Sequence, residues 1–291
     1  MSGGTLDVVR AGALTTVQDL GRSGHAGLGV PRAGALDLPA HRLANRLVGN
    51  SADAATLETT LTGVAVRTDR SVVAAVTGAP APVRVNGRPA AWGTAVRLPA
   101  GAVLDVGAPT SGLRSYVAVG GGIAVAPVLG SRSTDLLSGL GPAPLKDGET
   151  LPLGEVTGPP LHADTLLWPA PPEELVLPVL LGPRDDWFTA AAVDTLATGR
   201  YEISQHSNRI ALRLDGPPLE RTVHREMPSE GMVVGAVQVP PDGRPVVFLA
   251  DCPTTGGYPV IGVVPESLLS PAAQAVPGLT VRFVPRRHRR R

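Results

Sequence analysis

The chain of 291 residues is 43% hydrophobic and 18% charged, which is the composition of a folded globular protein rather than a disordered one. Its single cysteine, Cys252, excludes an intrachain disulfide and a multi-cysteine zinc or iron–sulfur site, and fits a reducing compartment. The net charge is only +1, and no basic stripe with interleaved aromatic residues is present, so we expect no nucleic-acid partner.

The first residues, MSGGTLDVVR, lack the apolar core of a secretory signal, and no run in the chain approaches the ~18 apolar residues of a membrane helix. We therefore expect a cytoplasmic protein without a membrane contact. The next clear element is a helix that Asp37 can cap, with Pro39 in its first turn and Gly49 at its end. Its predicted apolar face comprises Ala40, Leu43, Ala44, Leu47 and Val48.

The sequence VRVNGRPAAW, residues 83–92, predicts a hairpin that turns at Asn86-Gly87. Short β runs separated by glycines continue around it, so residues 72–122 predict a β meander or a barrel wall. Residues 151–174 hold six prolines and no sustained period, which is typical of a connector between two halves, 1–150 and 175–285.

In the second half, residues 183–199 predict a helix with acids at its N-terminal end, and Phe188, Ala191, Ala192 and Leu196 facing the core. Six strand-like runs follow, interrupted by PESLLSPAAQA, where Pro271 interrupts or restarts a helical segment. We expect residues 286–291, RRHRRR, to be a solvated, disordered tail. Thirty-five glycines and thirty prolines fit this picture of a mostly β protein made of two β-rich halves with few helices.

Several familiar catalytic patterns are missing, namely H-E-x-x-H, G-x-S-x-G, paired Cys-x-x-Cys and the P-loop. The only lysine, Lys146, lies between Leu145 and Asp147 rather than between methionines, so we expect no covalent biotin on this chain. Asp37 and His41 share a helix face, which suits either two metal ligands or a capping acid plus a surface histidine; we predict no metal site.

Four clusters of polar residues remain as candidates for a functional site: residues 15–24, 130–135, 204–209 with 228–231, and DCPTTGG at 251–257. Each mixes hydroxyls with a carboxylate or an amide, and arginines among them suggest a carboxylate or phosphate ligand. Neighbouring glycines would let backbone N–H groups approach that ligand. The alternative for each cluster is ordinary turn chemistry, in which such side chains bond their own backbone.

Longer stretches of the sequence show a family resemblance. The sequence GALTTVQDLGRSGHAGLGVPRAGALDLPAHRLANRLVGN resembles the start of the family of the 5-oxoprolinase C subunit, or allophanate hydrolase subunit 2, and also the carboxyltransferase part of urea carboxylase. LETTLTG, GLRSYVAVGGG, LGSRSTD, YEISQHSNRIALRLDG, SEGMVVGAVQVPPDGRPVVFLAD and TTGGYPVIGVV continue the match, from about Leu6 to Phe283.

The resemblance implies a mostly β protein of cyclophilin-like barrel architecture. It also implies partners: a homologous B subunit, which is similar to allophanate hydrolase subunit 1, and a separate A subunit. The expected reaction is the ATP-dependent opening of 5-oxo-L-proline to L-glutamate, with ATP used by the complex at an unknown site. The protein is thus expected to be a hydrolase subunit that is active only in the complex.

A cyclic amide acid has a carboxylate for an arginine and a polar ring amide. We therefore predict substrate contacts within the four clusters, from Gln18, Asp19, Arg22, Ser131, Arg132, Ser133, Ser207, Arg209, Thr254 and Thr255. Asp251 and Glu230 are the acid–base candidates. Cys252 as a nucleophile is a weaker alternative, because no histidine adjoins it in sequence. The turn that follows Asp251 is predicted to form a pocket wall.

Two other functions stay open. One is carboxyl transfer to urea or another small amide, with biotin on a separate carrier; the other is a regulatory protein that antagonises a kinase inhibitor. The chain also departs from its relatives in places: Asn208 stands where they often have aspartate, and Pro253 where many have glutamine. An additional departure is Ala33, which replaces the first of two glycines that relatives often carry.

Overall fold

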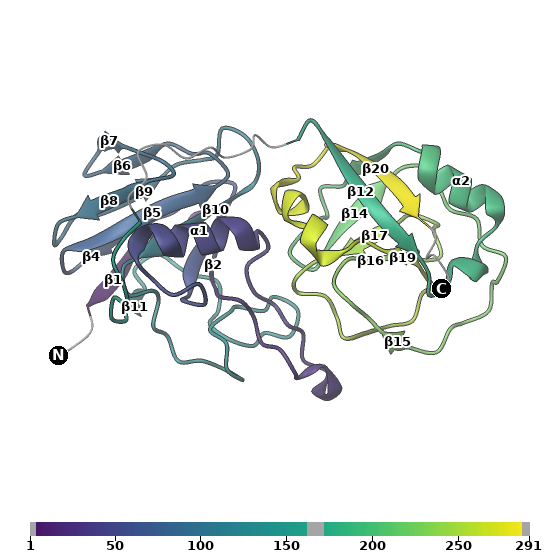
Figure 1. Ribbon diagram of the computed structural model, residues 1–291, viewed down its shortest axis with the longest axis horizontal. Coiled ribbons are helices and arrows are strands. Elements are labelled where there is room, and N and C mark those ends of the chain that lie inside the picture. The colour runs from purple at the N-terminus through teal and green to yellow at the C-terminus, as the bar shows by residue number, and fades with distance from the viewer. Residues whose placement is uncertain (1–3, 162–171, 287–291) are drawn as a thin grey trace. The chain divides into compact units, whose positions relative to one another are not determined.

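The computed structural model describes residues 4–161 and 172–286, and it divides into two compact units (Figure 1). Unit 1 consists of residues up to 22, 33–135 and 139–171, and unit 2 of residues 23–32, 136–138 and those from 172 onward. Two short segments, 23–32 and 136–138, therefore belong to the second unit although the chain around them belongs to the first. None of the helices in the described part is long and apolar enough to cross a membrane.

Unit 1 is built from two antiparallel sheets. The six-stranded sheet has the order β11 (Thr150–Pro152), β1 (Thr5–Arg10), β4 (Ala65–Thr68), β9 (Val103–Val106), β6 (Val83–Val85) and β7 (Arg88–Ala90). The five-stranded sheet has the order β2 (Leu14–Gln18), β3 (Thr56–Thr60), β10 (Arg114–Val119), β5 (Val72–Gly78) and β8 (Ala95–Leu98). Buried side chains from both sheets, such as Leu6, Leu104, Leu57 and Val117, form one core.

The predicted hairpin is confirmed. β6 and β7 pair with Val85 opposite Arg88, and the two turn residues between them have positive φ angles, 50° at Asn86 and 77° at Gly87. Both angles lie in the left-handed region, which an Asn-Gly pair adopts at little cost and which matches the twist of the flanking strands.

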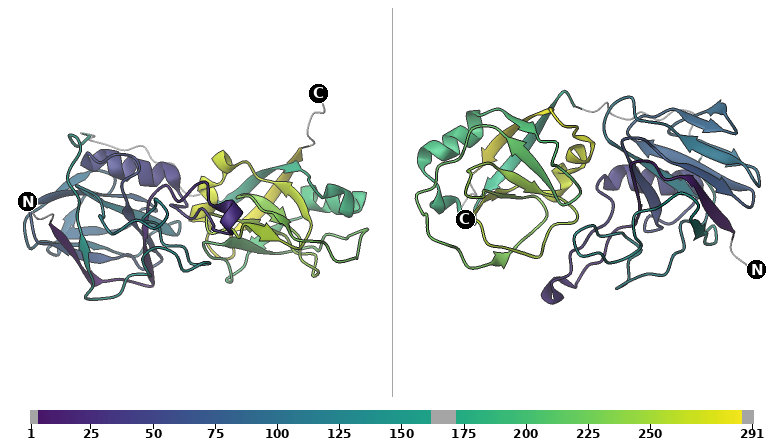
Figure 2. Two further views of the ribbon diagram at one scale, coloured as in Figure 1. Left: turned by 90° about the horizontal axis from the view of Figure 1, so that it is seen from below. Right: turned by 180° about the vertical axis from the view of Figure 1, so that it is seen from behind.

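The predicted first helix is also confirmed as α1 (Leu38–Val48) (Figure 2). Asp37 accepts a hydrogen bond from the backbone N–H of Ala40 at 3.2 Å, and Gly49 ends the helix with a φ of 78°. The helix packs on β5 and β10 through a second core, which contains Ala40, Ala44, Leu47, Val48, Ala75, Tyr116 and Ala118. His41 is fully buried, so the sequence-based reading of it as a surface histidine is wrong.

Unit 2 is a closed barrel with the strand order β12 (Glu174–Leu181), β19 (Val260–Val263), β16 (Ala236–Gln238), β17 (Val246–Phe248), β14 (Ala211–Asp215), β13 (Tyr201–Ile203) and β20 (Thr280–Arg286) (Figure 1). The last strand, β20, closes the ring: it pairs in parallel with β12 and antiparallel with β13. The predicted mostly β fold with a cyclophilin-like barrel is thereby confirmed. A short ribbon of β15 (Glu230–Gly231) and β18 (Thr255–Gly256) lies apart from these strands in the pairing order.

The helix predicted at 183–199 begins later than expected. Asp185 and Asp186 lie in a separate 3-10 turn, η2 (Asp185–Trp187), and α2 (Ala190–Thr198) starts after Thr189, whose side chain accepts from the N–H of Ala192. Thr189 is the better cap because its hydroxyl reaches an otherwise unpaired helical N–H group. The acids therefore do not sit in the first turn of the helix, and the predicted core position Ala191 is exposed, whereas Phe188, Ala192 and Leu196 are buried.

Two further predictions concern the helical segment around Pro271 and the connector. Pro271 does restart a helical segment, since η3 (Glu266–Leu268) is followed by η4 (Ser270–Gln274), but both are 3-10 turns. A further 3-10 turn, η1 (Ala26–Leu28), lies in unit 2. Residues 162–171 of the predicted connector and the arginine tail beyond 286 lie outside the described residues; the connector's first residues belong to β11, which pairs with β1.

Candidate functional site

Asp19 is the centre of a cluster that joins two of the predicted polar segments in unit 1. It follows the last residue of β2, and its carboxylate accepts hydrogen bonds from the hydroxyls of Ser131 and Ser133, both at 2.6 Å. The backbone N–H groups of Arg132 and Gly21 add bonds at 2.6 and 2.8 Å. Burial alone would raise the pKa of Asp19, but these four donors outweigh it and hold the pKa below its usual value. Asp19 is thus an anion that orders residues 131–133.

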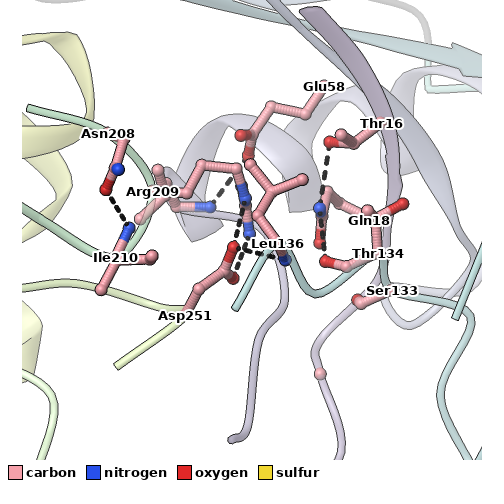
Figure 3. A network of polar contacts seen from close by, with 12 residues as sticks. Thr16, Gln18, Glu58, Ser133, Thr134, Leu136, Asn208, Arg209, Ile210 and Asp251 are labelled. Carbon is pink, nitrogen blue, oxygen red and sulfur yellow. Dashed lines mark hydrogen bonds and ion pairs between the residues drawn. The ribbon is translucent and has the colours of Figure 1, made fainter. Parts of the chain in front are cut away.

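Gln18 lies beside this cluster and is completely buried (Figure 3). Its Nε2 donates to the hydroxyl of Thr16 at 3.0 Å and to the backbone carbonyl of Thr134 at 3.1 Å. Its Oε1 has no hydrogen-bond partner in the described part of the chain, and neither has the hydroxyl of the buried Thr134. These two atoms without partners belong to residues that a hydrogen bond joins, from Gln18 Nε2 to the backbone carbonyl of Thr134.

Arg22 belongs to the same region and is 2% exposed. Its Nη2 donates to the backbone carbonyl of Ser133, and its Nε to that of Val128 at 3.4 Å. The third nitrogen, Nη1, has no partner among the described residues, and none of their carboxylates lies within ion-pair distance of this guanidinium. Arg132, by contrast, is half-buried, and its Nε donates a hydrogen bond to the backbone carbonyl of Val125 at 2.8 Å.

A second buried carboxylate, Asp251, follows β17 in unit 2 and pairs with Arg209 (Figure 3). The pairing is bidentate, with Arg209 Nη2 to Oδ1 at 3.0 Å and Nε to Oδ2 at 3.1 Å, and the backbone N–H of Leu136 adds a bond to Oδ2 at 3.2 Å. The side chains of Arg209 and Asp251 are 1% and 0% exposed. This arrangement suits a buried structural ion pair; the role of Asp251 as an acid–base group stays a prediction.

The loop that precedes Arg209 shows turn chemistry. The side chain of Asn208 accepts from the backbone N–H groups of Ile210 at 2.8 Å and Ala211 at 3.3 Å, as shown in Figure 3 for the first of these. The hydroxyl of Ser207 accepts from the N–H of Arg213 at 3.0 Å. Since both side chains are engaged with nearby backbone, the alternative of local turn chemistry describes Ser207 and Asn208 well.

Glu230 and Thr255 lie on the two strands of the β15–β18 ribbon, where Gly231 pairs with Thr255 and Glu230 with Gly256. Glu230 forms a partly exposed ion pair with Arg184, and hydrogen bonding to that guanidinium lowers the pKa of the carboxylate. Glu230 is therefore an anion at neutral pH and a weaker base than an unpaired glutamate. Thr254 is half-buried and Thr255 exposed.

An open hollow of about 760 Å³ lies in unit 2, and its wall includes Gly257, Tyr258 and Pro259 of the turn that follows Thr255. That this turn forms a wall of the substrate pocket stays a prediction. Opposite groups come from residues 218–227, where Arg225 stacks over the ring of Trp187 at 5.6 Å. None of the predicted substrate contacts lines this hollow. The charged run ERTVHRE, residues 220–226, is the sequence signal that could have indicated it.

Cys252 is buried, and burial raises the pKa of its thiol to about 12. A thiol at this pKa is protonated at neutral pH and is a poor nucleophile. Asp37 and His41 do not form a metal site either, because Asp37 caps α1 while His41 bonds Thr56 at 2.9 Å, and no group of three potential metal ligands occurs among the described residues.

Comparison with known proteins shows the family of this chain. A family model described as carboxyltransferase domain, subdomain A and B, matches residues 28–285. The chain belongs to this family. The resemblance that the sequence motifs indicated, to the 5-oxoprolinase C subunit and allophanate hydrolase subunit 2, is therefore confirmed.

Individual relatives separate into two kinds. The chain is 42% identical to the C subunit of 5-oxoprolinase from Escherichia coli K12, over 96% of this chain and 90% of that protein. It is 33% identical to urea amidolyase of Lachancea kluyveri, but covers only 17% of it. Among solved structures, urea amidolyase from K. lactis superposes with a TM-score of 0.90 at 30% identity, over 98% of this chain and 19% of that one. The chain thus spans nearly all of the first relative and about a fifth or less of the urea amidolyases.

Proposed function

We propose that this chain is the C subunit of an ATP-dependent 5-oxoprolinase, a hydrolase that opens the ring of 5-oxo-L-proline to give L-glutamate. The observation that carries the proposal is end-to-end similarity, at 42% identity, to a protein of that name. A second relative of the same name, from Haemophilus influenzae, is 31% identical and is also covered over 90% of its length. The urea amidolyases share the domain but embed it in much longer chains.

The proposed enzyme is a complex. Both of these relatives are named as the C subunit of 5-oxoprolinase, which supports the existence of partner subunits. We propose a B subunit similar to allophanate hydrolase subunit 1, together with an A subunit. ATP would be used by the assembled complex, in the cytoplasm, and we assign its site to no residue of this chain. Lys146 lies exposed in a turn between Leu145 and Asp147, and we propose that it carries no biotin.

Of the two acid–base candidates, Glu230 is the better placed for chemistry. Its carboxylate is partly exposed, whereas Asp251 is fully buried and engaged by Arg209. A general base must be within reach of substrate, and the partly exposed carboxylate of Glu230 meets this requirement although its pairing with Arg184 weakens it as a base. We therefore propose Glu230 as the proton acceptor and Asp251 as the counter-ion of Arg209.

The test is reconstitution. The purified chain is mixed with its B and A partners, ATP and 5-oxo-L-proline, and glutamate release is measured. We expect glutamate only when all three proteins and ATP are present, and a loss of activity when this chain is left out. A complete mixture that releases no glutamate would contradict the proposal.

A second function, carboxyl transfer to urea or another small amide, is favoured by the family description itself and by the urea amidolyase relatives. It would need biotin on a separate carrier protein. Supplying the same complex with a biotinylated carrier, a biotin carboxylase that loads it from bicarbonate and ATP, and urea tests it: consumption of ATP that depends on urea, on the biotinylated carrier and on this chain would support carboxyl transfer over ring opening.

A further inference from the structure

Three buried side chains of unit 1 end in polar atoms that have no partner in the described part of the chain: Oε1 of Gln18, Nη1 of Arg22 and Oγ1 of Thr134. The three residues are 0%, 2% and 2% exposed. Buried polar groups in folded proteins are nearly always paired, and each one that is not costs stability. Three together in one hydrogen-bonded region therefore need a physical reason.

The three residues are tied to the same short stretch of backbone. Gln18 donates to the carbonyl of Thr134, and Arg22 donates to the carbonyl of Ser133, the preceding residue. That stretch is itself fixed by the carboxylate of Asp19, which holds both Ser131 and Ser133. The orphan atoms are thus carried by a rigid arrangement rather than by a mobile loop, as a preorganised binding site requires.

The charge of Arg22 is the strongest part of the argument. A buried guanidinium is ordinarily paired with a carboxylate, as Arg209 is with Asp251 in unit 2. The carboxylate nearest in sequence, Asp19, already accepts four hydrogen bonds from other donors. A buried water molecule would satisfy the orphan hydroxyl and amide oxygen, but it would leave the positive charge without an anion.

The orientation of Gln18 defines the other half of the ligand. Both hydrogens of its Nε2 are used, by the hydroxyl of Thr16 and the carbonyl of Thr134. Turning the amide over would place Oε1 against the carbonyl of Thr134, which has no hydrogen to donate, so Oε1 remains an acceptor. The missing partner of Gln18 is therefore an N–H group, and the missing partner of Arg22 is an anionic oxygen.

We propose that Gln18, Arg22 and Thr134 form a buried subsite for a small molecule that carries an amide N–H close to a carboxylate. Arg22 Nη1 holds the carboxylate, Gln18 Oε1 accepts from the N–H, and the hydroxyl of Thr134 bonds either. The ring of 5-oxo-L-proline has both groups on neighbouring positions; naming it as the ligand rests on the proposed function, whereas the subsite itself rests on the three orphan atoms.

The first experiment uses the complete complex and the variants Arg22→Lys and Thr134→Val, with Thr77→Val as a matched control. Thr77 is also a buried threonine of unit 1, but its hydroxyl donates to the carbonyl of Ala40 at 2.8 Å. We expect KM for 5-oxo-L-proline to rise about tenfold or more in Arg22→Lys, because the charged hydrogen bond from Nη1 to the carboxylate is lost, and about threefold in Thr134→Val.

The stability readout separates a binding role from a structural one. Thr134→Val removes a hydroxyl without a partner, so the melting temperature of the free chain should stay unchanged or rise, while Thr77→Val should lower it and leave KM unchanged. Unchanged KM in both Arg22→Lys and Thr134→Val would overturn the subsite. A lower melting temperature of Thr134→Val with unchanged KM would assign its hydroxyl a structural role and also contradict the proposal.

The second experiment distinguishes failure of the subsite from failure of the proposed function. The complex is titrated calorimetrically with 5-oxo-L-proline, with 2-pyrrolidinone, which lacks the carboxylate, and with glutarate, which lacks the N–H. We expect 5-oxo-L-proline to bind more tightly than either, and Arg22→Lys to remove its advantage over 2-pyrrolidinone. If no glutamate is released but glutarate still binds in an Arg22-dependent manner, the subsite stands and the function fails. If no carboxylate binds in an Arg22-dependent manner, the subsite is wrong.

Discussion

Asp19 in unit 1 and Asp251 in unit 2 are both buried carboxylates with an arginine nearby in sequence or space, yet their charges are balanced differently. Asp251 is matched by Arg209 in a bidentate pair, so the charges balance within unit 2. Asp19 is held by hydroxyl and backbone donors, whereas the hydrogen bonds of Arg22 to the described residues go to backbone carbonyl groups. The comparison indicates that the first arrangement serves stability, whereas the second leaves a cation available for a ligand.

The largest effect should come from breaking the matched pair. Asp251→Asn leaves Arg209 buried beside an uncharged amide, and we expect the free energy of unfolding to fall by about 3–5 kcal/mol. Urea denaturation measures it. The exposed pair of Arg244 and Asp215 is the control, since Asp215→Asn should cost no more than about 1 kcal/mol. A loss as small in Asp251→Asn as in the control would mean that the buried pair contributes little.

Asp19→Asn should cost less, about 2 kcal/mol, because its partners are neutral donors that can find the amide oxygen. The pKa of Asp19 is lowered on folding, so its contribution to stability is present above the unfolded value near 3.8 and is lost as pH falls through the folded pKa. Unfolding free energies measured between pH 2 and 5 should therefore fall less steeply in Asp19→Asn than in the wild type. Equal slopes would contradict the assigned hydrogen bonds.

His41 provides a pH effect in a different window. Burial in α1 lowers its pKa to about 4 from 6.5, so the unfolded chain binds a proton that the folded chain does not. Stability from this group is full above pH 6.5 and is lost as pH falls toward 4, by roughly 3 kcal/mol. Denaturation across this range should show the slope in the wild type and a much smaller one in His41→Gln, while the exposed His206→Gln should keep it.

The smallest expected change in stability is that of Thr255→Ala. Its side chain is exposed, and the ribbon pairs through backbone groups, so the free energy of unfolding should change by less than about 0.5 kcal/mol. Glutamate release by the complex is the second measurement. A marked loss of activity at unchanged stability would support a substrate contact from Thr255; full activity would remove Thr255 from the predicted contacts.

The sequence predicted those features of the fold that depend on local chemistry. The cap at Asp37, the Asn86-Gly87 turn and the barrel strands follow from residues a few positions apart. The start of α2 was predicted too early, because Thr189 and not one of the preceding acids caps the helix. The burial of His41 could not be predicted, because it depends on Thr56 and on strands distant in sequence.

The candidate site was likewise predictable only in part from the sequence. Grouping residues 15–24 with 130–135 as polar clusters was possible from composition, and the structure joins them through Asp19. The sequence could not predict which of their side chains have all their hydrogen-bond partners, because Asp19, Gln18 and Arg22 are all polar residues of one short segment. Only the structure shows that the carboxylate of Asp19 has four hydrogen-bond donors, whereas Nη1 of Arg22 has no partner among the described residues.

The closure of the barrel by β20 has a consequence for biosynthesis. β12 is made more than a hundred residues before its parallel neighbour, so during translation its edge stays open until Thr280–Arg286 has left the ribosome. Because strands with open edges pair with other strands, a nascent chain stalled before this point would be prone to aggregation. Shortening the chain to end before residue 280 should therefore yield insoluble protein, even though every residue of the Asp19 cluster would still be present.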